Sequence, residues 1–301
     1  MPPTSHPNHS GHTLVELLTV IGIVTVLVGI LLPAAGSARE SARRSQCQNR
    51  LRQLGIAIAN FETRYQHLPG NGGTDRESTL VSTDGESVRP YTREFATGIT
   101  RYWGVGDARR PTTGQPGPWS FALLPDLELG NQQDRASFAA AVSAFRCPSR
   151  SRGDALPPRA DRYGFYESGG HSMAKTDFAA NHLVLRDRPK VSSFSDLSDG
   201  LSQTILFGEK AFDGLVQTET SWHWDEPIYI GGSKGTAREG VKILTDGPGI
   251  DYADNWGSPH PSLAQFIFVD GHLQVIAAEI DPKVFAAMLS PAQGDLIDDD
   301  R

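Results

Sequence analysis

A glycine-rich segment in the C-terminal half has the spacing of a serine hydrolase nucleophile. Residues 231–235 match Gly-x-Ser-x-Gly, the sharp strand-to-helix turn that exposes the nucleophile of α/β-hydrolases. Ser233 would be that nucleophile, and Asp246 or Asp251 and then His260 follow in the order of such a triad. The residues that follow the motif predict no helix, because a glycine interrupts them and a short strand-like run comes next. We therefore expect a hairpin loop here and no catalytic residues.

Carboxylates in a second glycine-rich loop have the chemistry of a cation site. Asp246, Asp251 and Asp254 are close in sequence, and Ca²⁺ prefers oxygen ligands. Their spacing is not that of an EF-hand, and Asp and Gly are also ordinary turn residues. The histidines show no zinc-type spacing. We expect no metal and no cofactor, with calcium at these three aspartates as the open alternative.

His260 and the pair Asp270-Gly271 are a second candidate for catalysis or metal binding. Residues 261–269, when extended, span roughly 30 Å, so His260 and Asp270 would lie at opposite ends of one strand. Asp-Gly between the apolar runs 264–269 and 272–277 predicts a β-hairpin with a type I′ turn. We expect Asp270 and Gly271 to form that turn and His260 to pack where the strand begins.

The composition limits the function classes. The chain has 301 residues and a net charge of −7, and nucleic-acid binding requires a basic face, so no nucleic-acid partner is expected. The 31 glycines and 20 prolines concentrate between residues 69 and 170, which predicts a loop-rich middle section.

An apolar segment near the N-terminus has the length of a membrane span. Residues 17–32 carry no charge, and with their apolar neighbours they approach the roughly 20 residues that cross a hydrocarbon core. Glu16 lies at the start of this segment, where a carboxylate costs roughly 2.5–3.5 kcal/mol on insertion scales. Such a residue requires a functional explanation.

The expected elements place these residues in a membrane helix, a second helix and a strand-rich domain. Leu51, Leu54, Ile58, Phe61 and Tyr65 form an apolar stripe at helical spacing. We expect a transmembrane helix over 12–35, an amphipathic continuation over 36–68, and a domain over 69–301. Within that domain, 69–175 is loop-rich, 176–280 is β-rich and 282–289 is helical. Further candidates are helices at 119–127 and 135–145 and strands at 203–209, 227–230 and 241–244.

The N-terminus resembles those of type IV pilins and type II secretion pseudopilins. A short polar leader (1–11) ends at Gly11 and is followed by His12-Thr13-Leu14-Val15-Glu16 and the apolar run. The resemblance implies that a prepilin peptidase cuts between Gly11 and His12 and that the new N-terminus is methylated. It also implies that Glu16 pairs with the terminal amine of a neighbouring subunit during assembly. The alternatives are a secretory signal cut near residues 34–38 and a plain signal anchor.

Motifs along the rest of the chain resemble the prepilin-like proteins grouped as domain of unknown function 1559. This resemblance implies an α+β, pilin-like fold in which a long N-terminal helix packs on an antiparallel β-sheet domain. The family has no established biochemical activity. The motifs that carry the resemblance are residues 38–49, 124–128, 145–149 and 199–209, and a His-x(9)-Asp-Gly module of His260, Asp270 and Gly271.

These resemblances imply a non-enzymatic, membrane-anchored subunit of a type II secretion or type IV pilus-like assembly. Its partners would be a prepilin peptidase, other pilin-like subunits and inner-membrane lipid, and its single span would place the domain outside the bacterial cytoplasm. The positive-inside rule opposes this orientation, because Arg39, Arg43 and Arg44 follow the span. The alternatives are an anchored periplasmic or surface binding protein and a tethered hydrolase centred on Ser233.

The chain has two cysteines, Cys47 and Cys147. Disulfides persist in oxidising compartments, so a domain outside the cytoplasm predicts a bond between them that ties the long helix to the rest of the domain. The alternative is two buried free thiols.

Overall fold

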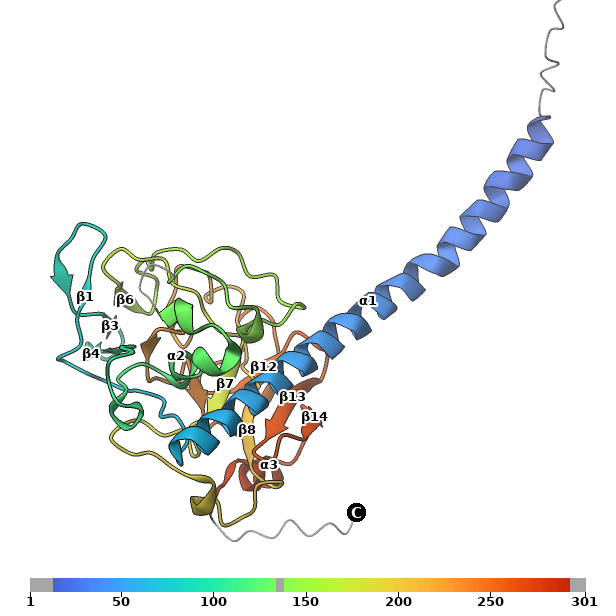
Figure 1. Cartoon of the computed structure of the whole chain (residues 1–301). Helices are drawn as coiled ribbons and strands as arrows, with labels where there is room; N and C mark the ends of the chain where they lie inside the picture. Colours follow the sequence, from blue (N-terminus) through green and yellow to red (C-terminus); the bar gives the residue numbers. More distant parts are fainter. Residues whose placement is uncertain (1–12, 134–137, 293–301) are drawn as a thin grey trace, which may run out of the picture. The chain divides into compact units, whose positions relative to one another are not determined.

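The computed structural model describes residues 13–133 and 138–292 (Figure 1). The chain divides into two compact units, one that ends at Arg43 and one that begins at Arg44. The second unit, from Arg44 onward, is called the body here. The expected leader, 1–11, and His12 lie outside the described residues. Helix α1 (Leu14–Tyr65) belongs to both units and is uninterrupted, which confirms the long N-terminal helix.

The N-terminal unit is the apolar part of α1. An 18-residue window of this helix has a mean hydropathy of 2.7, and none of that window is buried. The helix is therefore long and apolar enough to cross a membrane by length and composition.

The body is organised around a five-stranded sheet in the order β10-β7-β8-β13-β14 (Figure 1). Neighbouring strands are antiparallel except β10 and β7, which are parallel. The α+β fold class is thus confirmed. The strands are β7 (Phe178–Asn181), β8 (Ile205–Glu209), β10 (Ala237–Arg238), β13 (Leu263–Phe268) and β14 (Leu273–Ala277).

Alternation along β13 sends its side chains into two separate cores. Ile267 joins the larger core, which includes Leu51 and Leu54 of α1. Phe266 joins a second core with Phe285 of helix α3 (Pro282–Leu289). Both faces of the sheet are therefore covered, one by α1 and the other by α3, as the two apolar faces of the hairpin predict.

Helix α1 approaches the sheet closely at a glycine. A Cβ built on Gly55 would lie 2.6 Å from Cδ1 of Ile267. The N-terminus of α3 is capped by Asp281, whose carboxylate accepts a hydrogen bond of 2.7 Å from the Lys283 N–H. Asp281 before Pro282 is the predicted N-cap.

Nine shorter strands make four small sheets among the described residues. Strands β1–β6 lie in the section expected to be loop-rich, where polar, weakly patterned residues form short strands that pair either with a near neighbour or with a strand distant in sequence. Strand β9 begins three residues later than the strand expected at 227–230. Strand β11 begins two residues later than the strand expected at 241–244. The pairs are β1 (Leu80–Val81) with β2 (Ser87–Val88), β3 (Tyr91–Glu94) with β4 (Thr100–Tyr102) and β6 (Gly164–Glu167), β5 (Gly104–Val105) with β9 (Ile230–Gly231), and β11 (Ile243–Thr245) with β12 (Trp256–Ser258).

The middle helices are shorter than expected. The single helix expected over 119–127 is wrong: α2 (Trp119–Ala122) ends early, and the 3-10 turn η2 (Pro125–Leu127) follows because Pro125 interrupts helical hydrogen bonding. Of the helix expected over 135–145, the described part contains only the 3-10 turn η5 (Ser143–Phe145). Residues 134–137 lie outside the described residues. Three further 3-10 turns are η1 (Thr112–Gly114), η3 (Gly130–Gln133) and η6 (Phe194–Asp196).

The hairpin between β13 and β14 exists, but its predicted two-residue type I′ turn is wrong. The Phe268 N–H donates to the His272 carbonyl at 2.9 Å, and the Gly271 N–H donates to the Phe268 carbonyl at 3.0 Å. The loop therefore has three residues, 269–271. Gly271 has a φ of 89°, whereas Asp270 does not have the positive φ that a type I′ turn requires. The glycine alone takes the left-handed conformation.

Replacing Gly271 with valine is expected to destabilise the body by about 1–2 kcal/mol, because a β-branched residue is strained at positive φ. Gly271→Asn is the matched control and should be milder, since asparagine tolerates this conformation. All five tryptophans lie in the body, so their fluorescence during urea unfolding of the detergent-solubilised chain measures the effect. Equal stability of both variants would contradict the assigned turn.

Candidate functional site

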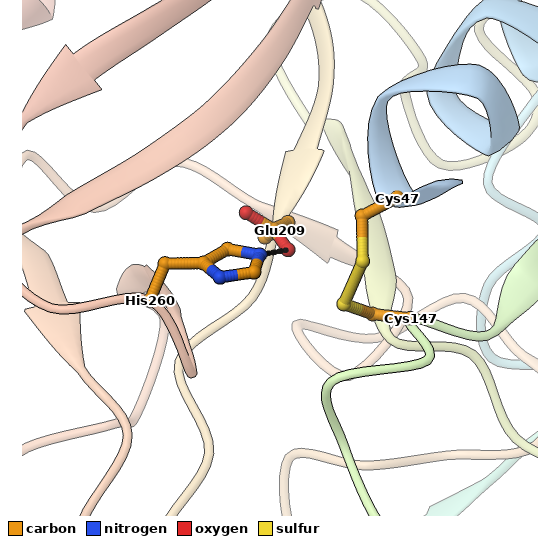
Figure 2. Close-up of side chains that lie close together, drawn as sticks. All are labelled: Cys47, Cys147, Glu209 and His260. Carbon is orange, nitrogen blue, oxygen red and sulfur yellow. Dashed lines mark ion pairs between the residues drawn. A yellow bond between two sulfur atoms is a disulfide. The ribbon is translucent and has the colours of Figure 1, made fainter. Parts of the chain in front are cut away.

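A disulfide joins Cys47 of α1 to Cys147, just beyond η5 (Figure 2). The two Cα atoms are 5.0 Å apart, and both residues are buried. The predicted bond is confirmed, and the alternative of two free thiols is wrong. The bond covalently attaches the body's part of α1 to the segment that follows η5.

Glu209 and His260 lie beside this disulfide (Figure 2). Glu209 Oε1 is 3.8 Å from His260 Nε2, and both side chains are buried. Burial raises the pKa of Glu209 to about 8, although nearby Arg150 favours its charged form. The other carboxylate oxygen accepts a 3.0 Å hydrogen bond from the Gln265 N–H.

The cluster has the donor types of a metal site. One ligand atom from each of Cys47, Cys147, Glu209 and His260 lies within 4.8 Å of the others. A zinc site of this kind needs thiolates, however, and both sulfur atoms are held in the disulfide. In the oxidised chain the cluster is part of the packed interior.

The two ends of the His-x(9)-Asp-Gly module are separate, as the strand between them predicts. His260 precedes β13, whereas Asp270 follows it in the exposed hairpin loop. The Asp270 carboxylate accepts a 3.0 Å hydrogen bond from the His272 N–H and lies 2.7 Å from the His272 ring. Sequence reasoning did not identify Glu209 as the neighbour of His260, although an acidic residue that ends an apolar strand is a visible signal.

The hydrolase residues do not form a triad in the described part of the chain. The Ser233 hydroxyl accepts a 2.8 Å hydrogen bond from the Gly235 N–H. Asp246 pairs with Arg150 at 2.8 Å, and His260 lies beside Glu209. Each residue considered for the triad therefore has a different neighbour. A loop at Ser233 is confirmed, but it is not the expected hairpin loop, because β9 before it pairs with β5 and β10 after it pairs with β7.

The three calcium candidates are also separated by their partners. Asp246 pairs with Arg150, Asp251 pairs with Lys242 at 3.2 Å, and the Asp254 carboxylate accepts from Lys234 at 2.9 Å. Each of the three carboxylates is paired with a different basic side chain. The described residues thus do not gather these oxygens around one point.

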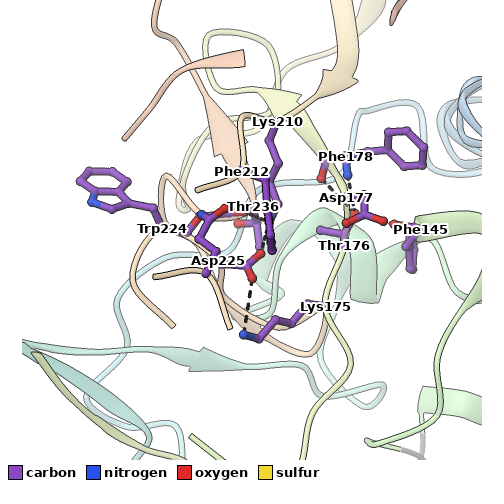
Figure 3. Close-up of polar contacts among 12 residues, drawn as sticks. Phe145, Lys175, Thr176, Asp177, Phe178, Lys210, Phe212, Trp224, Asp225 and Thr236 are labelled. Atoms are coloured by element: carbon purple, nitrogen blue, oxygen red, sulfur yellow. Dashed lines mark hydrogen bonds and ion pairs between the residues drawn. The ribbon is translucent and has the colours of Figure 1, made fainter. Parts of the chain in front are cut away.

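A network of buried charges lies inside the body, and Asp225 is its most heavily paired member. Figure 3 shows Asp225 with Lys175 and Lys210. The carboxylate contacts Arg152 at 2.8 Å, Lys210 at 2.7 Å and Lys175 at 3.4 Å. Burial alone would raise the pKa of Asp225, but these three cations outweigh it and hold the pKa well below its usual range. Asp225 is therefore ionised in the interior.

Asp177 links this network to the disulfide. Its carboxylate pairs with Arg152, lies 3.7 Å from Arg150, and accepts a 2.7 Å hydrogen bond from the Cys147 N–H. Burial opposes ionisation of Asp177 too, yet the two arginines lower its pKa. Sequence reasoning missed the network, because its members come from distant segments and follow no periodic pattern.

Glu16 has a partner within its own chain. Its carboxylate accepts a 2.9 Å hydrogen bond from the Thr13 N–H, and the Thr13 hydroxyl accepts one of 3.3 Å from the Glu16 N–H. This reciprocal arrangement is a capping box, which the spacing Thr-x-x-Glu could have predicted. The expected cleavage residues Gly11 and His12 lie outside the described residues.

The fold and these sites define a class: an α+β body on a long N-terminal helix that is apolar enough to span a membrane. The chain belongs to the family described as protein of unknown function DUF1559, whose model matches residues 36–283. Comparison with curated proteins and with solved structures found no match.

Removal of the disulfide is expected to destabilise the body. A closed loop with a sequence separation of 100 residues stabilises by up to about 4.7 kcal/mol in the chain-entropy model. The double variant Cys47→Ala, Cys147→Ala should lower the free energy of urea unfolding substantially, as should a reducing agent on the natural chain. The double variant is the control for the reducing agent, which should leave it unchanged. Free thiols in non-reducing peptide maps would contradict the assignment.

Loss of the Asp225 charge is expected to lower the free energy of unfolding by about 3–5 kcal/mol, because three buried cations lose a compensating carboxylate. Asp225→Asn keeps the shape of the side chain and removes only its charge. The matched control is Asp251→Asn, which removes the exposed ion pair with Lys242. This variant should change the free energy of unfolding by no more than about 0.5 kcal/mol. Urea unfolding measures both, and similar small effects would show that the network contributes little.

Proposed function

We propose that this protein is a non-enzymatic, membrane-anchored, pilin-like subunit. The observation that carries the proposal is α1: an exposed apolar helix with Glu16 in its first turn continues into a helix packed on the sheet of the body. Membership of the DUF1559 family agrees with this function. A prepilin peptidase would cut between Gly11 and His12, and the new amine would be methylated.

Assembly with other pilin-like subunits would use the same helix. Apolar side chains between Leu14 and Leu32 would contact inner-membrane lipid before assembly and neighbouring helices afterwards. Glu16 would exchange its bond to the Thr13 N–H for the terminal amine of a neighbour. A charged partner forms a stronger hydrogen bond than a neutral N–H, so the exchange favours assembly. A type II secretion or type IV pilus-like structure is the assembly that this helix suits.

The disulfide supports a body outside the cytoplasm. Disulfides persist in oxidising compartments and are rare in the cytosol, so Cys47–Cys147 favours the periplasm or the cell surface. The disulfide thus opposes the orientation that Arg39, Arg43 and Arg44 predict by the positive-inside rule, in which the body would lie in the cytoplasm. We therefore place the single span in the bacterial inner membrane with the body outside.

A non-enzymatic role agrees with the partners of the candidate catalytic residues. His260 lies at 3.8 Å from Glu209, and Asp246 is paired with Arg150. Neither is free to activate Ser233 without losing these contacts.

Intact-mass analysis of the protein from its native membrane tests the processing step. The mature chain is expected to begin at His12 with one added methyl group on its amine. A chain that retains Met1, or one cut near residues 34–38, would rule out prepilin processing and with it the proposed route to assembly.

Glu16→Ala is expected to abolish assembly while the body stays folded, because the carboxylate for the neighbour's amine is lost. The matched control is Thr13→Ala, which removes half of the capping box but keeps Glu16. Crosslinking between subunits in membranes, compared with the fluorescence of the body, measures both properties. Assembly of Glu16→Ala at the natural level would contradict this role.

A further inference from the structure

A cavity of about 320 Å³ in the body belongs to none of the sites described above. Its volume is near the lower limit for small-molecule sites. Strands β3 and β4, the turn around Ser233 and the segment 223–226 contribute to its wall, so residues distant in sequence converge there. Its lining comprises Thr74, Thr92, Glu94, Arg101, Trp103, His182, Asp187, His223, Trp224, Glu226, Gly232, Ser233 and Lys234.

Glu226 is a buried polar group in this wall with an unused hydrogen-bonding atom. Glu226 is only 4 % exposed. Its Oε2 atom has no hydrogen-bond partner among the described residues. The Ser233 hydroxyl bonds to the carboxylate, and burial raises its pKa. A Cβ on Gly235 would overlap Oε2, so a glycine is needed there. Oε2 lies against Gly235 and is enclosed by the protein, so a ligand in the cavity can reach this carboxyl group only at Oε1.

Trp224 lines the cavity in an unusual backbone conformation. Its φ is 58°, which is rare for a bulky residue, and strained residues of this kind cluster at active sites and ligand clamps. The Arg238 guanidinium donates a 2.9 Å hydrogen bond to the Trp224 carbonyl and holds the backbone in place. Two indoles, those of Trp224 and Trp103, thus belong to one cavity wall.

Apart from Glu226, whose neutral form is favoured by burial, the charged residues of the wall are paired with one another or with nearby residues. Arg101 lies 3.8 Å from Glu94, and His182 lies 3.2 Å from Asp187. Lys234 pairs with Asp254, which is outside the lining. Because these charges are already paired, the wall offers a charged ligand no strong counter-ion. It does offer many hydrogen-bonding atoms.

The hydroxyl groups in the wall suit a ligand that both donates and accepts. Thr92 Oγ1 accepts the Trp103 indole N–H at 2.9 Å, which leaves the hydroxyl proton available to another acceptor. Glu226 Oε1 is the carboxyl oxygen that a donor in the cavity can reach. A sugar hydroxyl serves both purposes, and the C–H face of a sugar ring packs on the electron-rich face of an indole.

We propose that this cavity binds a neutral, hydroxyl-rich small molecule, a mono- or disaccharide, with one sugar hydroxyl donating to Glu226. The site is independent of membrane assembly, and the proposed subunit function stands or falls without it.

Saturation-transfer NMR and calorimetry on the full chain test this binding. The detergent must carry no sugar headgroup, since a glucoside or maltoside would compete. The probes are D-glucose, N-acetyl-D-glucosamine and cellobiose, with glucuronate and putrescine as anionic and cationic comparisons. At least one neutral sugar is expected to bind, to quench tryptophan fluorescence, and to bind better than either charged probe.

Variants locate the binding. Thr74 is exposed at the cavity, so Thr74→Trp should block it without disturbing the core, whereas Thr83→Trp places the same side chain on an exposed residue outside the lining. Glu226→Gln should lose roughly fivefold in affinity, as expected for one hydrogen bond between neutral groups. If this variant does not fold, the effect of Thr74→Trp on sugar binding decides whether the cavity is the binding site.

Three results would overturn the proposal. They are no binding of any of the neutral sugars, stronger binding of putrescine or glucuronate than of the sugars, and sugar binding that Thr74→Trp leaves intact. The last result would place the sugar elsewhere on the protein.

Discussion

The body depends on the compensation of Asp225 and Asp177 inside the protein. An ionised carboxylate in a protein interior is costly unless cations and hydrogen bonds surround it. Here the cations come from the segment after Cys147 and from the ends of β7 and β8. Any arrangement that separates these segments leaves a buried charge without a partner. The network therefore discriminates strongly against alternative arrangements of loops that have little regular structure of their own.

The hydrophobic core and the charge network determine different features of the fold. Alternation along β13 and the stripe on α1 determine which faces meet, since Ile267 and Leu51 belong to one core and Phe266 to the other. Such contacts are non-directional and tolerate small shifts. The charge network adds direction: the Asp177 carboxylate accepts the Cys147 N–H and pairs with Arg152. The position of Cys147 opposite Cys47 follows from that contact.

Local patterns predicted the parts of this structure that local interactions determine. The Asp281-Pro282 start of α3, the pairing of β13 with β14 and the two-sided burial of that hairpin all follow from short stretches of sequence. The disulfide followed from the cysteine count and the expected compartment. The helix expected over 119–127 failed at Pro125, and the type I′ turn failed because only Gly271 needs a positive φ.

The sites required long-range information. Glu226 and Trp224 join the cavity through a loop whose sequence has no apolar period, and Arg152 reaches Asp225 across 73 residues. Spacing rules compare only neighbours along the chain, so the Gly-x-Ser-x-Gly match at Ser233 carried no information about its contacts in the fold. Glu16 is the opposite case, because its capping partner Thr13 is three residues away and was visible in the sequence.

The position of Cys47 has a mechanical consequence. It lies three residues after Arg44, within the first turn of α1 in the body. A pulling force applied through the N-terminal part of α1 reaches the body first at a covalent bond and only later at the packed side chains of Leu51 and Leu54. Tension is therefore shared with the segment after Cys147 before it can peel the helix from the sheet. A body tethered in this way resists extraction of its own helix.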